Sequence, residues 1–266
     1  MSEKVEKEMS FLDHLEELRW HIIRSIIAIL VIGIVVFLCK DLIFAIIFAP
    51  KNPDFLTYRL FCALSDATCF RPPEFELIIR QLGEQFFTHI KVSIWVGLIV
   101  AFPYVFYEFW KFIKPGLYPN EQKAARGIVL VCSILFIMGV LFGYYIIAPF
   151  AVSFLASYSV GVDVLSSPTL ASYVNYLTMF TIPTGIIFEL PVFVYFFSKI
   201  GLLTPAFMKK YRKHAFIIIL IIAAIITPPD VLTQFLIGIP IFILYEISIF
   251  ISARVEKKAK AEAAKS

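Results

Sequence analysis

Long apolar runs separated by short polar connections dominate the chain. A helix needs about 20 apolar residues to cross a hydrocarbon core about 30 Å thick, because in lipid every backbone polar group must be satisfied within the segment. The runs predict an all-α membrane protein with six transmembrane helices, in a single polytopic domain spanning residues 1–266. Their expected limits are about Trp20–Cys39, His89–Trp110, Gly127–Phe150, Tyr173–Phe197, Ala215–Thr227 and Val231–Ile251. The fifth is conspicuously short, and the pattern shows no internal repeat.

The segment before the first span is polar on one side and apolar on the other. Its Ser10-Phe11-Leu12-Asp13 pattern is typical of a capping box, which predicts a helix start near Phe11. We therefore expect residues 1–19 to form an amphipathic segment at the membrane surface. No small-residue cleavage site follows the first apolar run, so we expect the first span to be retained.

Lysine and arginine gather in alternate connections, which predicts the orientation of the chain. Residues 151–172 and 228–230 contain neither residue type, whereas the connections on the other side are basic. The long loop 40–88 carries five bases and six acids, and long loops cross the membrane largely regardless of charge. We expect both termini in the cytoplasm, an external loop at 40–88 and a basic cytoplasmic tail at 252–266.

Composition narrows the class of function. Hydrophobic residues make up 60% of the chain and charged residues only 17%, which excludes an ordinary soluble protein. The net charge of +4 arises at the ends of apolar runs, so we expect contact with lipid headgroups and none with nucleic acid. The chain contains no HExxH, Gly-x-Ser or Walker motif, so we expect no enzymatic activity.

One acidic residue lies deep within an apolar run. A charged group at Glu189 would cost about 2.5–3.5 kcal/mol at the centre of a membrane helix, so its side chain should face protein or a water-filled cavity. Pro183, Gly185 and Pro191 predict a bend there, which could form the wall of a concavity. Two interpretations stay open for Glu189: a buried hydrogen bond between helices, or a place on a substrate or proton path.

Other acids lie near helix ends. Glu108 and Glu246 should reach headgroup water, and a structural role is favoured for both. Glu16, Glu17 and Glu121 could form local pairs with Arg19 and Lys123, or could together capture a cationic ligand through bidentate guanidinium–carboxylate bonds.

Histidines and cysteines offer further chemistry. His14, Glu17 and His21 share a helical face but lack a second set of ligands, so no metal and no cofactor is predicted. Cys39 and Cys132 are interpreted as small buried hydrophobic residues. Cys62 and Cys69 lie together in the external loop, where a disulfide can persist.

Four stretches in chain order resemble the TatC family, the multi-spanning subunit of twin-arginine (Tat) protein translocases. They are HLEELR at 14–19, FIKPGLYPNE at 112–121, FELP at 188–191 and TPPD at 227–230. Together with six spans, both ends inside and a short fifth helix, they form a specific pattern that runs from about Phe11 to Ile251. His21 stands where members often carry another base, and the external loop is longer than expected between residues 52 and 80.

The resemblance implies a glove-shaped receptor, not an enzyme, in the bacterial cytoplasmic (inner) membrane. Such a receptor binds Arg-Arg signal peptides of folded precursors and assembles with single-span TatA-type and TatB-type proteins, and with copies of itself, for export driven by the proton-motive force. Signal-peptide contacts then fall to Glu17, Arg19, Glu121 and Glu189, partner contacts to Thr227 and Gln234, and structural roles to Pro50, Pro191 and Asp230. The alternative is a proton-coupled small-solute transporter, for which Glu189 would serve equally well. An intramembrane hydrolase ranks third, because the chain shows no pair of nucleophile and base.

Overall fold

The computed structural model describes residues 11–66, 69–114, 127–159, 161, 167–226 and 231–263. Regular secondary structure in this part of the chain is helical, and one isolated β-bridge joins Ile78 to Thr169. The chain divides into two compact units. Unit 1 comprises Met1–Lys40 and His89–Ser133, and unit 2 comprises Asp41–Thr88 and Ile134–Ser266.

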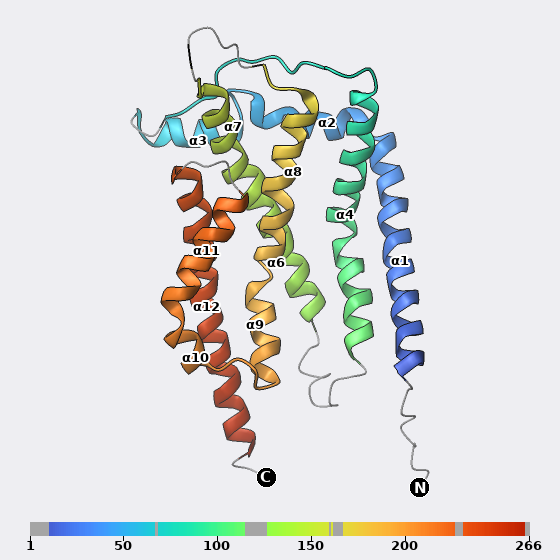
Figure 1. Ribbon diagram of the computed structural model, residues 1–266, viewed down its shortest axis with the longest axis vertical. Helices are drawn as coiled ribbons and strands as arrows, with labels where there is room; N and C mark the ends of the chain where they lie inside the picture. The colour runs from blue at the N-terminus through green and yellow to red at the C-terminus, as the bar shows by residue number, and fades with distance from the viewer. Residues whose placement is uncertain are drawn as a thin grey trace. The chain divides into compact units, whose positions relative to one another are not determined.

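Unit 1 is built on α1 (Phe11–Leu38) and α4 (Glu84–Ile113), which run side by side (Figure 1). The two helices approach closely at glycines. A Cβ atom added to Gly97 would lie 3.0 Å from Gly33 Cα and 3.0 Å from the Ile29 carbonyl oxygen. Small residues that allow backbones to approach are typical of helix contacts in membranes. Helix α1 is described from Phe11 onward, and Ser10 lies outside the described residues, so the capping box stays a prediction.

Unit 2 holds the remaining helices. From Ile128 onward the helical elements are α6 (Ile128–Phe142, which begins in unit 1), the π-helical turn η4 (Gly143–Ile147), α7 (Ala148–Ser157), α8 (Leu170–Ile187), α9 (Leu190–Lys199), α10 (Pro205–Lys210), α11 (Arg212–Ile226) and α12 (Val231–Ala263). Within the unit, α12 packs against α9 and α11, while α8 packs against η4 and α7. At one end lie α2 (Lys40–Phe48), the 3-10 turn η1 (Ala49–Lys51) and α3 (Leu56–Leu64).

The predicted membrane spans are present. Five described helical segments are long and apolar enough to cross a membrane: His14–Leu38, Glu84–Ile113, Ile128–Ser157, Leu170–Lys199 and Gln234–Ala261. The remaining predicted span, the fifth along the chain, is α11, whose 15 residues measure only about 22 Å at 1.5 Å per residue. The fifth helix in the order of spans is therefore short, as the sequence predicted.

Two spans are interrupted. The third changes from α-helix to π-helix at Gly143, and the fourth breaks at Phe188 and Glu189, between α8 and α9. Pro191 is buried in the first turn of α9, where a proline nitrogen needs no hydrogen-bond partner. The bend expected from Pro183, Gly185 and Pro191 is thus present, and it falls just before Pro191.

The third and fourth spans touch through glycines. A Cβ atom at Gly143 would lie 2.5 Å from the Phe180 carbonyl oxygen, and one at Gly139 would lie 2.7 Å from the Thr184 carbonyl oxygen. Gly143→Ala should therefore force the two backbones apart and lower the free energy of unfolding by about 1–3 kcal/mol. Unfolding by sodium dodecyl sulfate, followed by circular dichroism, measures the change. Gly161→Ala is the matched control, because a Cβ atom there meets nothing within 4 Å; equal losses in both variants would contradict the packing argument.

The loop 40–88 is largely structured, which the sequence did not reveal. Tyr58 of α3 is fully buried, and its hydroxyl donates to the carbonyl oxygens of Pro50 at 2.9 Å and Pro149 at 3.1 Å. Burial raises the pKa of Tyr58, so the hydroxyl stays protonated and keeps donating at alkaline pH. The Thr57 hydroxyl donates to the Tyr145 carbonyl oxygen. These bonds fix α3 and η1 to the third span.

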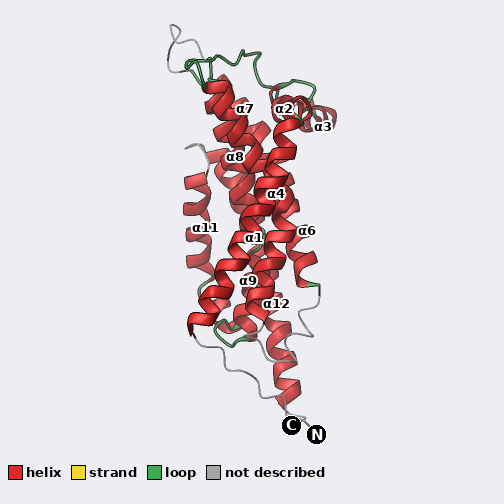
Figure 2. Ribbon diagram, turned by 90° about the vertical axis from the view of Figure 1, so that its right-hand side faces the viewer, coloured by secondary structure: helices red, strands yellow, loops and turns green. Residues whose placement is uncertain are grey.

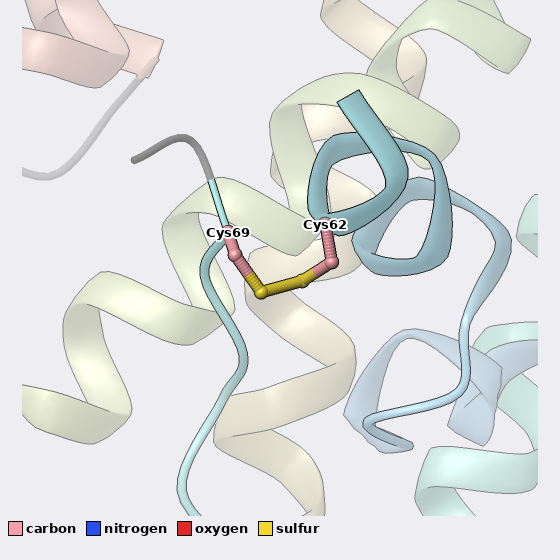
Figure 3. Close-up of a disulfide and its surroundings, with 2 residues drawn as sticks. All are labelled: Cys62 and Cys69. Atoms are coloured by element: carbon pink, nitrogen blue, oxygen red, sulfur yellow. A yellow bond between two sulfur atoms is a disulfide. The ribbon is translucent and has the colours of Figure 1, made fainter. Parts of the chain in front are cut away.

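The predictions for the four cysteines were confirmed for three of them and wrong for one. Cys62 in α3 and Cys69 in the segment after it form a disulfide, as expected (Figure 3). Cys132 is buried, as expected, but Cys39 is exposed, so its interpretation as a buried residue was wrong. Cys39 lies at the junction of α1 and α2.

The disulfide should contribute measurably to stability. It closes a short loop, for which the chain-entropy model gives about 2.5 kcal/mol at 25 °C. The double variant Cys62→Ser, Cys69→Ser should lose that free energy of unfolding, and dithiothreitol should cause the same loss in the native chain. The double variant itself should not respond to dithiothreitol. A native chain indifferent to the reductant, at confirmed thiol release, would contradict this expectation.

Candidate functional site

A polar face of α1 points to α4 near the first turns of α1. His14, Glu17, His21 and Arg24 recur at intervals of three or four residues, so they lie on one side of the helix. On α4 the facing residues are Glu108 and Phe112, one turn apart. All of these side chains belong to unit 1.

The centre of this face is a buried ionisable pair. His21 Nδ1 lies 2.6 Å from Glu108 Oε2, and the two residues are only 5% and 4% exposed. Arg24 Nη1 lies 3.8 Å from the same oxygen, and the Tyr104 hydroxyl also hydrogen-bonds to Glu108. The expectation that Glu108 reaches headgroup water was therefore wrong. Its structural role is to hold α4 against α1.

An aromatic contact extends the face toward the start of α1. The His14 ring stacks on Phe112 with centroids 4.4 Å apart, and the His21 ring meets the same Phe112 edge-on at 6.1 Å. Both histidines therefore have packing partners. Among the described residues no three His, Cys, Asp or Glu side chains are grouped to hold a metal ion.

Glu17 lies between the two histidines in sequence and on the same face. Its Oε2 atom is buried and has no hydrogen-bond partner among the described residues. Leaving a buried carboxylate oxygen unpaired costs more than 1 kcal/mol, and a guanidinium would remove that cost with a charge-assisted bond. Glu17 is thus prepared to accept a cationic donor.

Arg19 does not pair with Glu17. Its Nη2 atom lies 3.5 Å from Glu16 Oε1, and both side chains are about two-thirds exposed, so the pair contributes at most about 1 kcal/mol. The alternative of a local pair thus applies to Glu16 and Arg19 and not to Glu17. Glu121, the second predicted acid of the site, lies outside the described residues.

Glu189 occupies the break in the fourth span, within unit 2. The residue is 5% exposed, and its backbone nitrogen donates to the Ile186 carbonyl oxygen at 3.1 Å. Its carbonyl oxygen accepts from Val192 at 2.9 Å, so the turn between α8 and α9 is closed by the backbone. The structure agrees with a buried acid at a bend. Its role toward a ligand stays a prediction.

The predicted partner site lies on the hairpin of α11 and α12. Gln234 Nε2 donates to the Leu220 carbonyl oxygen at 3.1 Å, which ties the start of α12 to α11. At the other end of the hairpin Arg212 Nη2 lies 2.7 Å from Glu246 Oε2. Thr227 and Asp230 lie outside the described residues, so the grouping of Thr227 with Gln234 stays a prediction.

The pairing of His21 with Glu108 was missed at the level of sequence. Each residue is polar in an apolar run and lies near the same end of its span, and two such residues in consecutive antiparallel helices are a usable signal. The signal does not specify a partner, because each polar residue could face any of several neighbouring helices.

Comparisons with known proteins agree with this architecture. The family model described as "Sec-independent protein translocase protein (TatC)" matches residues 13–240. Over 259 residues the chain is 42% identical to the Sec-independent protein translocase protein TatC of Blattabacterium sp. subsp. Periplaneta americana, covering 94% of this chain and 97% of the relative. Identity to TatC of Aquifex aeolicus is 37% over 254 residues, covering 95% of this chain and 98% of that one.

A solved structure is similar as well. The crystal structure of a twin arginine translocase receptor, TatC, superposes with a TM-score of 0.71 at 36% sequence identity, covering 91% of this chain and 99% of the other. Sequence and fold thus agree over nearly the whole length. The chain belongs to the TatC family of Sec-independent protein translocase proteins.

Proposed function

We propose that this chain is the receptor subunit of a twin-arginine translocase in the bacterial cytoplasmic membrane, with both termini in the cytoplasm. It binds the Arg-Arg signal peptides of folded precursors near the start of α1 and assembles with TatA-type partners for export driven by the proton-motive force. The observation that carries the proposal is the Oε2 atom of Glu17, which is buried and has no hydrogen-bond partner among the described residues, on a face where His14 and His21 are packed.

Selectivity for arginine follows from the setting of that carboxylate. An exposed ion pair contributes only about 0–1 kcal/mol, which is too little to select one peptide among many cationic ones. A charge-assisted hydrogen bond to a partly buried carboxylate contributes about 1.5–3 kcal/mol, and a guanidinium can form two in parallel. Glu121 would supply the second acid, so two consecutive arginines would fit better than scattered charges. Lysine lacks the planar fork and should bind less well.

Assembly with a TatA-type helix is assigned to the hairpin of α11 and α12. Gln234 forms its bond with Leu220 within this hairpin, so its amide is satisfied before any partner arrives. A partner with its own polar group would have to replace the Leu220 carbonyl oxygen as the hydrogen-bond acceptor of Gln234. The short α11 leaves little apolar length here, which favours a polar helix as neighbour. Glu189 would line the path of the signal peptide.

An export assay tests the function. A bacterium that lacks its own TatC receives this chain together with its TatA-type and TatB-type proteins, and export of a folded reporter with an Arg-Arg signal is followed by fractionation. We expect export that stops when the signal carries Lys-Lys or when the proton-motive force is dissipated. A correctly inserted chain that leaves the reporter in the cytoplasm, or exports both signals equally, would overturn the proposal.

A further inference from the structure

Helix α3 has an apolar face that no described residue covers. Leu56, Leu60 and Leu64 recur every four residues on one side of the helix, and they are 53%, 60% and 79% exposed. Arg59 is exposed at the edge of the same face. Three leucines at such exposure in an aqueous loop would form an unfavourable apolar stripe, because fully burying one leucine is worth about 1.5–3 kcal/mol.

The opposite face of α3 is fixed to the third span. Tyr58 and Thr57 donate to the carbonyl oxygens of Pro149 and Tyr145, and the Phe61 ring meets the Phe150 ring edge-on at 5.2 Å. The disulfide between Cys62 and Cys69 ties the helix to the segment after it (Figure 3). The leucine face therefore cannot turn inward without breaking these contacts.

The contact points on the third span give the depth of α3. Tyr145 follows Ile128, the first residue of that span, by 17 residues and therefore by about 26 Å. Phe150 follows Ile128 by 22 residues and about 33 Å. One of these two distances is shorter and the other longer than the thickness of a hydrocarbon core, which is about 30 Å. A hydrocarbon core that begins at Ile128 would place α3 at the boundary between acyl chains and headgroups.

The third span also exposes an apolar side next to α3. Met138, Leu141 and Tyr145 of the third span are 51%, 46% and 37% exposed along the side that ends at α3. The Tyr145 ring stacks on Phe55, the residue before α3, with centroids 5.5 Å apart. Figures 1 and 2 show α3 lying across the direction of α7 and α8. This orientation is typical of a helix that lies in the plane of a membrane surface. Aromatic side chains are also enriched at such surfaces.

We propose that α3 is an interfacial helix whose leucine face inserts into the outer leaflet, with phospholipid acyl chains as its ligand. Arg59 at the edge of the face extends toward the phosphates, as long basic side chains do at such boundaries. The helix anchors the external loop to the bilayer beside the third span. This assignment does not depend on recognition of signal peptides.

Spin labels test the assignment in full-length protein reconstituted into vesicles of phosphatidylethanolamine and phosphatidylglycerol. The background is Cys39→Ser, because Cys132 is buried and Cys62 and Cys69 are bonded to each other. Single labels at Leu56→Cys and Leu60→Cys are compared with one at Asp54→Cys, an exposed polar position just before α3. Collisions with oxygen, which concentrates in lipid, and with a water-soluble nickel chelate are measured for each label.

We expect both leucine-face labels to collide several-fold more with oxygen than with nickel, and the Asp54→Cys label to show the reverse. Nickel access at Leu60→Cys equal to that at Asp54→Cys would place α3 in water and overturn the proposal. Exclusion of both reagents from the leucine face would also overturn it, because a protein surface or a second copy would then cover the helix. Export activity of the labelled variants is recorded separately, so that failure of the receptor function and failure of the lipid assignment are distinguishable.

Discussion

Glu17→Lys is expected to abolish binding of an Arg-Arg signal peptide, and Glu17→Gln is expected to weaken it roughly 10- to 150-fold. The range corresponds to losing one charge-assisted bond of about 1.5–3 kcal/mol. Charge reversal has the larger effect because it places a cation at the position of the buried Glu17 Oε2 atom, which has no hydrogen-bond partner in the described part of the chain. Binding of a fluorescent peptide to purified protein in detergent measures both changes.

Glu16→Gln is the matched control for this prediction. Glu16 carries the same charge one residue away, but its side chain is 65% exposed and pairs with Arg19. Its loss should change affinity by no more than about fivefold, because exposed pairs contribute about 0–1 kcal/mol. A Lys-Lys peptide should bind weakly and respond little to either variant. If Glu16→Gln and Glu17→Gln weaken both peptides equally, the effect is diffuse electrostatics and Glu17 is not the arginine site.

Features governed by local pattern could be predicted from the sequence. Apolar length identified the spans, including the short fifth one that forms α11, because hydrocarbon thickness imposes a nearly fixed helix length. The buried position of Glu189 followed from the cost of exposing a carboxylate to lipid. Each inference needed only residues close together in the chain.

Features that depend on distant contacts could not be predicted. The sequence predicted only a long external loop at 40–88, in which the structure forms α2 and α3. What fixes α3 is the burial of Tyr58 against Pro149, residues 91 apart in the chain, and no local pattern contains that contact. Cys39 was misjudged for the related reason that an apolar neighbourhood in a membrane protein does not distinguish a lipid-facing residue from a buried one.

The second large effect is expected at the buried pair in unit 1. His21→Ala should lower the free energy of unfolding by about 3–5 kcal/mol, because it leaves the Glu108 carboxylate buried without its nearest partner. Arg24 cannot replace the histidine without moving, since its Nη1 atom lies 3.8 Å away and half of its side chain is exposed. Unfolding by sodium dodecyl sulfate, followed by circular dichroism, gives the loss.

Companion variants decide whether the pair itself is responsible. Glu108→Gln keeps the shape and a hydrogen bond to His21, so it should cost only about 1 kcal/mol. The double variant His21→Ala, Glu108→Gln should then be more stable than His21→Ala alone, because it no longer buries an unpaired charge. That recovery distinguishes an electrostatic pair from a cavity, since replacing glutamate by glutamine does not fill the space of a missing imidazole. Strictly additive losses in the double variant would show that His21 acts through packing on Phe112, the ring it meets at 6.1 Å, and not through the carboxylate.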